Sequence, residues 1–297
     1  LKKSLTDYLS CNSSEIFKQS FKIIIIYIFL TLIIFIFLKI INLRTFDAFN
    51  FSLTLISSGG FLPTNNIDLL FQNDISKFIL SMLMLLSFFS LFLIYNLVFF
   101  KKRNVSYLSE DLNLLVYLLV IVFIFFVFFN KNNEFLNLLV SVSSSVSNIG
   151  ISFSNSSNDL YFLFFILVII GGSFFSTSSG LRLIKIIGLI KFSLNNLLSH
   201  TKPNQIYSNK VSLIDSNTDI SDINKYFLSI IIFVLSLLSI TILLTISNID
   251  FDTSFKIGIL TIMNTVNSNM YTLGEFDFYN LGFFTKIYLI IFMIIGR

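Results

Sequence analysis

Three short clusters of small polar residues have the composition needed to bind a bare cation through peptide oxygens. They are Ser57-Ser58-Gly59-Gly60, Ser147-Asn148-Ile149-Gly150 and Asn264-Thr265-Val266-Asn267. Carbonyl oxygens replace the water around a monovalent cation only when several of them point toward one axis. Such a backbone visits positive φ values, which glycine adopts freely, asparagine tolerably and β-branched residues poorly. The chemistry that these clusters favour is ion coordination without a charged side chain.

Residues for covalent or metal chemistry are scarce. The chain of 297 residues has one cysteine, Cys11, and one histidine, His200, which excludes a disulfide framework and a multi-cysteine metal site. A membrane enzyme acting on lipids is a remote alternative, and it would need clustered His, Asp or Glu at the membrane interface. The candidates for it are Glu110, Asp111, Asp215, Asp219, Asp222 and His200. They lack metal-ligand spacing, and solvated loop charge explains them better, so we expect no enzyme and no covalently bound cofactor.

The elements that carry the clusters belong to a membrane protein. Hydrophobic residues make up 55% of the chain and charged residues 12%, about half the charged share of a soluble domain. Apolar runs long enough to span a bilayer cover residues 21–41, 75–100, 112–129, 160–192, 226–246 and 281–296. The fourth run is too long for one span and is interrupted by the polar residues 171–180. We expect a multi-pass protein in a lipid bilayer, with no nucleic acid among its partners.

Three shorter stretches lie between these runs, and each ends in one of the polar clusters. They cover residues 45–56, 134–146 and 251–263, and all are too short to span. The order of long helix, half-helix, polar loop and long helix therefore occurs three times, as an internal repeat. Non-helical backbone at membrane depth is tolerated only where it lines water or is buried in protein, so we predict re-entrant hairpins. Basic residues gather between the repeats and acidic residues beside the hairpins, which predicts hairpins that enter from outside.

The clusters carry a resemblance to a known family. Residues 54–61 and 145–151 resemble the second and third filters of the Trk/Ktr/HKT potassium transporter superfamily, bacterial TrkH type. Residues 171–185 resemble the Gly- and Ser-rich stretch that breaks the inner helix of that family's third repeat. Asn264-Thr265-Val266-Asn267 stands at the fourth filter, and Met293 to Arg297 match the family's Met-x-x-Gly-Arg. The order and spacing agree along essentially the whole chain.

The resemblance implies an all-α membrane protein of helix–pore-loop–helix repeats around a pseudo-fourfold pore, here incomplete. Residues 1–104 would form the second repeat and residues 105–200 the third, with its broken inner helix. Residues 201–297 would form a cytoplasmic loop and a truncated fourth repeat. The chain is thus expected to be a fragment without the first repeat and the tail.

The resemblance also implies potassium uptake across the bacterial cytoplasmic (inner) membrane, with K⁺ as the transported ion. The implied filter residues are Ser58, Gly59, Gly60, Phe61, Ser147, Asn148, Ile149, Gly150, Thr265, Val266 and Asn267. The implied gate residues are Gly171, Gly172, Ser173, Phe174, Phe175, Ser178, Ser179, Gly180 and Arg297. The implied partners are a second copy, forming a homodimer, and a cytosolic nucleotide-binding regulatory subunit. The basic loop over residues 182–225 is either a docking face for that subunit or charge that only sets the topology.

Several positions depart from the family pattern. Asn267 replaces a glycine and is expected to take its positive φ, while Phe174 and Phe175 replace small residues. Ser178 and Ser179 stand where glycine is usual. These departures leave open a sodium-permeable variant and a degenerate, non-conducting relative. Arg297 either faces the pore as an electrostatic barrier or snorkels to the cytoplasmic face. A secondary transporter with a midplane site is a further alternative, which the single broken span favours weakly.

Overall fold

The described part of the chain consists of helices and short turns. The computed structural model describes residues 16–62, 67–89, 91, 106–129, 135–153, 160–173, 176–201, 220–273, 276 and 278–296, and no strand occurs among them. Its α-helices are α2 (Ile16–Ile40), α3 (Thr45–Ser57), α4 (Asp74–Leu85), α6 (Ser106–Phe129), α7 (Phe135–Val146), α8 (Tyr161–Ile170), α9 (Leu183–Thr201), α10 (Ile220–Ile246), α11 (Phe251–Ile262) and α12 (Phe283–Gly296). Two 3₁₀ turns, η2 (Asn269–Tyr271) and η3 (Phe278–Asn280), lie between α11 and α12.

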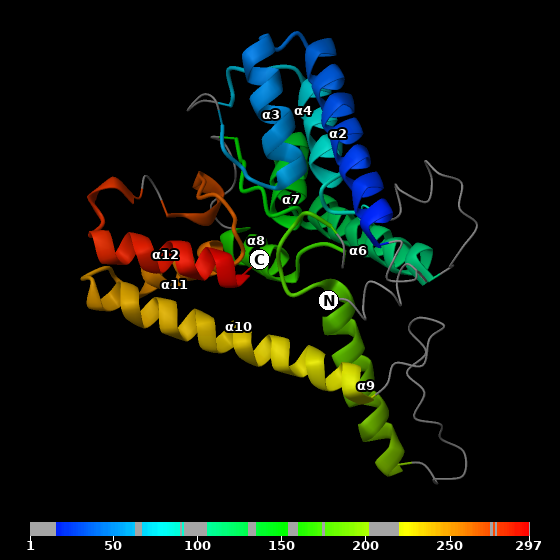
Figure 1. Ribbon diagram of the computed structural model, residues 1–297, viewed down its shortest axis with the longest axis vertical. Coiled ribbons are helices and arrows are strands. Elements are labelled where there is room, and N and C mark those ends of the chain that lie inside the picture. Colours follow the sequence, from blue (N-terminus) through cyan, green and yellow to red (C-terminus); the bar gives the residue numbers. More distant parts are fainter. Residues whose placement is uncertain are drawn as a thin grey trace.

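These helices form three successive units of the same kind. The units are α2-α3-α4, α6-α7-α8 and α10-α11-α12, each with a half-helix in its middle. The half-helix of each unit packs against the long helix before it, and the last helix of one unit packs against the half-helix of the next, as α4 does on α7 and α8 on α11. The middle unit therefore lies between the other two (Figure 1).

The three half-helices are too short to cross a membrane. They contain 13, 12 and 12 residues, or about 18–20 Å at 1.5 Å per residue, against about 30 Å of hydrocarbon. Their bounds agree closely with the predicted stretches 45–56, 134–146 and 251–263. Each ends where its glycine-, serine- or asparagine-containing cluster begins, because those residues leave the helical conformation.

Helix α7 is the buried centre of the arrangement. Residues 140–151 are all buried, although five of the seven residues from Ser141 to Ser147 are serines. Four of these hydroxyls donate to carbonyl oxygens of the preceding turn, which satisfies them inside the protein: Ser141, Ser143, Ser145 and Ser147. The fifth, Ser144 Oγ, accepts the backbone N–H of Ile151 at 2.6 Å. This bond holds the chain that leaves the second cluster against the back of α7.

The long helices expose apolar side chains, as lipid-facing helices do. On α2, Ile24, Ile28 and Leu32 are more than half exposed, and on α10 Leu228, Ile232 and Leu235 are at least half exposed. Two helices of the described part, over Ile23–Ile40 and Ile223–Ile246, are long and apolar enough to cross a membrane. Shorter apolar helices include Tyr161–Ile170 and Phe283–Gly296.

The prediction of one continuous second span over residues 75–100 is wrong at its centre. Helix α4 ends at Leu85, and the N–H groups of Leu86, Ser87 and Phe88 then bond three residues back, in tighter turns. The carbonyl oxygens of Ser87 and Phe88 accept hydrogen bonds from the backbone N–H groups of Ser178 and Ser173, in a distant loop.

The predicted interruption of the fourth apolar run is present. Helix α8 ends at Ile170 and α9 begins at Leu183, and the described residues between them are not helical. We call residues 171–182 the interrupting loop. Its Phe174 and Phe175 lie outside the described residues.

Candidate ion filter and interrupting loop

All three half-helices end in the same hydrogen-bonded cap. The N–H of Ser58 bonds to the carbonyl three residues back and that of Gly59 to the carbonyl five residues back. Asn148 with Ile149, and Asn264 with Thr265, repeat this pair of bonds, which defines a Schellman motif. The capping residues Ser58, Asn148 and Asn264 have φ of 53°, 59° and 52°, the left-handed conformation that the motif requires. We call residues 58–61, 148–151 and 264–268 the first, second and third pore loops.

The three pore loops meet at one place. Gly60, with φ of 66°, lies so close to the second loop that a Cβ built on it would overlap the carbonyl oxygen of Ile149. The same Cβ would lie 2.8 Å from a methyl group of Val266 in the third loop. Gly150, with φ of 84°, lies against the backbone of Val266, and a Cβ there would overlap the Val266 carbonyl oxygen. Backbones can approach so closely only because both positions are glycine.

The third loop differs from the other two, and the expectation for Asn267 is wrong. The caps align Ser58, Asn148 and Asn264, so that Val266 occupies the place held by Gly60 and Gly150. Neither Val266 nor Asn267 has a positive φ. Valine is β-branched and strongly disfavours that region, so the backbone of the third loop takes another path after its cap. The left-handed residue of this loop is Asn264, and Asn267 does not stand in for a glycine of positive φ.

The meeting point is electrostatically suited to a cation. The carboxyl ends of the three half-helices converge there, and the helix dipole places about half a negative charge at each such end. Residues 57–61, 146–151 and 263–268 contain no charged side chain. No group of three His, Cys, Asp or Glu within the described residues is arranged to hold a metal ion. Neutral oxygens, of the peptide groups and of the serine, threonine and asparagine side chains, and helix dipoles are therefore the groups that this part of the protein offers to a cation.

The candidate filter residues do not share one environment. Ile149, Asn148 and Ser147 are fully buried, and Thr265 is 7% exposed. Phe61, by contrast, is 74% exposed. The sequence prediction grouped these residues and did not separate those at the contact of the loops from those beside it.

The interrupting loop is closed at its base. Gly171 and Gly180, with φ of 66° and 112°, lie against one another so tightly that a Cβ on either would meet backbone atoms of the other side. The N–H groups of Leu181 and Arg182 bond back to the carbonyls of Ile169 and Ile170, both at 2.9 Å. The loop thus leaves and rejoins the end of α8 at nearly the same point.

The loop is seated on the end of α4. The backbone N–H of Ser173 donates to Phe88 O at 3.1 Å and that of Ser178 donates to Ser87 O at 3.3 Å. The hydroxyl of Thr177 also donates to Ser87 O at 3.2 Å. These bonds join the middle unit to the first one.

The side chain of Arg182 forms hydrogen bonds across the interrupting loop. Its guanidinium Nη1 donates to Ser173 O at 2.7 Å and to Ser176 Oγ at 2.8 Å. Arg182 has φ of 71°, which is unusual for a residue with a long side chain. The charge-assisted bonds across the loop offset the cost of that conformation.

A second set of bonds ties the loop to two of the pore loops. The side-chain amide of Asn148 donates to Ser179 Oγ at 3.0 Å and to Met263 O at 3.4 Å. The hydroxyl of Ser179 in turn donates to Met263 O. Asn148 is fully buried and Ser179 is 8% exposed, so these bonds are shielded from water. Sequence reasoning placed Asn148 in the filter and Ser179 in the gate but did not foresee that they touch.

Helix α12 ends against the third pore loop. Gly296 packs on Ile262, so tightly that a Cβ would overlap the Ile262 carbonyl oxygen. The side-chain amide of Asn264 donates to Met293 O at 2.9 Å. The Met-x-x-Gly part of the resemblance therefore lies directly behind the cap of α11, while Arg297 lies outside the described residues.

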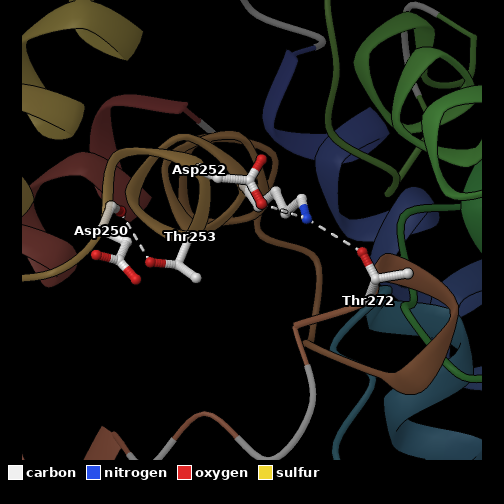
Figure 2. A network of polar contacts seen from close by, with 5 residues as sticks. Asp250, Asp252, Thr253 and Thr272 are labelled. Atoms are coloured by element: carbon white, nitrogen blue, oxygen red, sulfur yellow. Dashed lines mark hydrogen bonds and ion pairs between the residues drawn. The ribbon is translucent and has the colours of Figure 1, made fainter.

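A buried lysine that sequence reasoning did not single out lies at the contact between the middle and last units. Lys256 of α11 forms an ion pair with Asp252 at 2.7 Å and donates to Thr272 Oγ1 at 3.1 Å (Figure 2). Its ammonium lies 5.0 Å from the ring centroid of Tyr161 on α8. The sequence did indicate this residue, because a lysine inside an apolar half-helix needs a polar partner. In the preceding contact, Lys77 of α4 donates to Asn137 Oδ1 at 2.8 Å.

The arrangement of these helices is similar to that of a solved structure. No protein-family model and no curated protein matches the sequence. The crystal structure of the potassium transporter TrkH from Vibrio parahaemolyticus superposes with a TM-score of 0.79 at 20% sequence identity. The match covers 96% of this chain and 63% of that chain, so this chain spans less than two thirds of its length. The repeated units, the capped half-helices and this similarity together show that the chain has the all-helical fold of a TrkH-type membrane transporter.

Proposed function

We propose that this chain forms a path for a monovalent cation, potassium, across the bacterial cytoplasmic membrane, with peptide oxygens of the pore loops as the ion ligands. The convergence of three capped half-helices on Gly60, Ile149 and Gly150 carries the proposal. Flow would follow the electrochemical gradient and need no covalent chemistry. The fold of the chain supports a transport function, and the absence of charge at the loops favours a cation held by carbonyl groups over one held by carboxylates.

The interrupting loop is the proposed gate. It lies between α8 and α9 and bonds to residues at the ends of α4, α7 and α11. Moving a segment without helical hydrogen bonds costs less free energy than moving a helix, because only the few specific bonds of the segment must break. We therefore propose that displacement of this loop opens and closes the path beneath the filter.

The three units would supply three sides of the pore. We propose that residues 1–104, 105–200 and 201–297 correspond to successive repeats, and that a further unit of this kind closes the remaining side. Helix α3 presents Phe46, Phe49 and Leu53 on one exposed apolar face, in agreement with such a neighbour. A homodimer and a cytosolic nucleotide-binding regulatory subunit remain the proposed partners.

A non-conducting relative is the second candidate, and Val266 favours it. The side chain of Val266 reaches Gly60 and its backbone touches Gly150, so the three loops are in direct contact. In this alternative the protein keeps the fold, but its loops remain shut. The variant Val266→Gly separates the two candidates, because it removes the methyl groups at that contact.

The experiment is growth of a potassium-uptake-deficient bacterial strain at low external K⁺, together with rubidium uptake by liposomes that contain the purified protein joined to a fourth unit. We expect rescue by the wild type and by Gly188→Ala, whose new methyl group meets only the Tyr226 ring, at 3.5 Å. We expect loss of uptake in Gly60→Ala, whose methyl group would overlap Ile149 O. Membrane-inserted wild type without rescue would contradict the proposal, and rescue by Val266→Gly alone would establish the non-conducting alternative. Competition of sodium with rubidium uptake tests the sodium-permeable variant.

A further inference from the structure

The hydroxyl group of Ser179 occupies an unusual place in the interrupting loop. It accepts a hydrogen bond from the Asn148 side chain, which caps α7, and donates one to Met263 O, at the end of α11. One hydroxyl thus joins the interrupting loop to the second and third pore loops. The neighbouring Ser178 is equally small and buried, but its hydroxyl pairs with Ser176 Oγ at 2.8 Å, inside the loop.

The bonds of Ser179 reach residues directly beside the loop contact. Asn148 precedes Ile149, whose carbonyl oxygen lies against Gly60. Met263 precedes Asn264, the cap of the third loop, and Val266 follows within the same loop. A change in the position of Ser179 therefore acts on two of the three backbones that meet at the proposed ion site.

Other contacts hold the described part of the interrupting loop together. Arg182 bonds across it, and Gly171 packs against Gly180 at its base. Buried hydrogen bonds are strong in a low-dielectric interior, and the loss of one partner leaves the other group unsatisfied. Removal of the Ser179 hydroxyl would leave both an amide hydrogen of Asn148 and the Met263 carbonyl with fewer partners.

We propose that Ser179 is a positioning residue that couples the interrupting loop to the pore loops and thereby sets the spacing of the carbonyls that select the ion. The inference rests on the proposed function, since it assigns the control of selectivity at the same site. Ser179 touches no ion and acts through the backbones of residues 148–150 and 263–266. A purely structural role would lower stability without changing the preference between two cations.

The test compares Ser179→Ala with the matched control Ser178→Ala, in the complete protein in liposomes. We expect Ser179→Ala to lower the preference for rubidium over sodium about fivefold, the size that corresponds to one net hydrogen bond. Ser178→Ala is expected to keep the wild-type preference. Equal preferences in both variants and the wild type, with measurable uptake, would overturn the inference while leaving the proposed function in place.

A second measurement does not depend on transport. The thermal unfolding midpoints of Asn148→Gly, Ser179→Ala and the double variant form a double-mutant cycle, and glycine at residue 148 keeps the positive φ. We expect the double variant to lose clearly less than the sum of the two single losses, because each single variant already breaks the shared bond. Additive losses would overturn the link. If the wild type carries no ion, the proposed function fails, and this cycle alone decides whether the link exists.

Discussion

Replacing Gly150 by alanine tests whether the pore loops meet as the structure has them. The residue has φ of 84°, and a Cβ built on it would lie 2.8 Å from Val266 N and 2.9 Å from Val266 C, and would overlap the Val266 carbonyl oxygen. An L-residue in the left-handed region costs about 1–2 kcal/mol. Forcing an extra methyl group into a packed interior typically costs about 1–3 kcal/mol more.

The two costs set the expected size of the effect. Alanine regains about 0.4–1 kcal/mol through the lower entropy of the unfolded chain, which leaves a net loss of about 1–4.5 kcal/mol. At about 2–4 °C for each kcal/mol, the unfolding midpoint should fall by roughly 2–18 °C. The assay is thermal unfolding of the purified protein in detergent, followed by the helical circular dichroism signal.

Gly188→Ala is the matched control for this prediction. Gly188 lies within α9, has no positive φ, and a Cβ on it would meet the Tyr226 ring at 3.5 Å, an ordinary contact. Alanine is the better helix former by about 0.8–1 kcal/mol, so this midpoint should hold or rise. Equal midpoints for Gly150→Ala and Gly188→Ala would refute the close approach of the second and third pore loops.

Three further predictions concern other features and use the same unfolding assay. Ser58→Gly should raise the free energy of unfolding by about 1 kcal/mol, and with it the midpoint, because Ser58 has positive φ and a buried hydroxyl without a hydrogen-bond partner. A lower midpoint would contradict this. Asp252→Asn should cost about 1 kcal/mol and Lys256→Met almost nothing, because the lysine side chain is 11% exposed and the aspartate 74%, so that only the first change leaves a buried charge with less compensation; the reverse order would be the contrary result. Arg182→Gln should cost about 1–3 kcal/mol, since it removes two charge-assisted bonds across the interrupting loop, and an unchanged midpoint would show that this loop does not need them.

Much of the fold was predictable because it depends on local patterns. An apolar run of about 20 residues spans a membrane and one of about 12 does not, whatever surrounds it. The half-helices α3, α7 and α11 therefore appear within one or two residues of their predicted bounds. Residues 171–180 interrupt the fourth run because serine and glycine favour the helix poorly and bond readily to other backbone groups.

The prediction failed where distant segments compete for the same backbone groups. We predicted a continuous second span because Ser87 and Phe88 lie in an apolar run. Their carbonyl oxygens instead accept hydrogen bonds from Ser178 and Ser173, about 90 residues later in the chain. The resemblance placed Asn267 at a glycine of the family, yet the positive φ belongs to Asn264, and Val266 takes the place of Gly60 and Gly150. Register within a loop depends on where the preceding helix is capped, which no residue type determines alone.

The sequence by itself determined the repeat of long helix, half-helix and polar loop, because hydrophobic length and the conformational freedom of glycine, asparagine and serine are properties of short segments. Only the tertiary structure decided that Gly60, Ile149 and Val266 touch, and that Ser179 bonds to both Asn148 and Met263. These contacts join residues that are up to about 200 positions apart in the chain. They form because each half-helix has too small an apolar surface to be stable alone and becomes buried only against the helices of its neighbours.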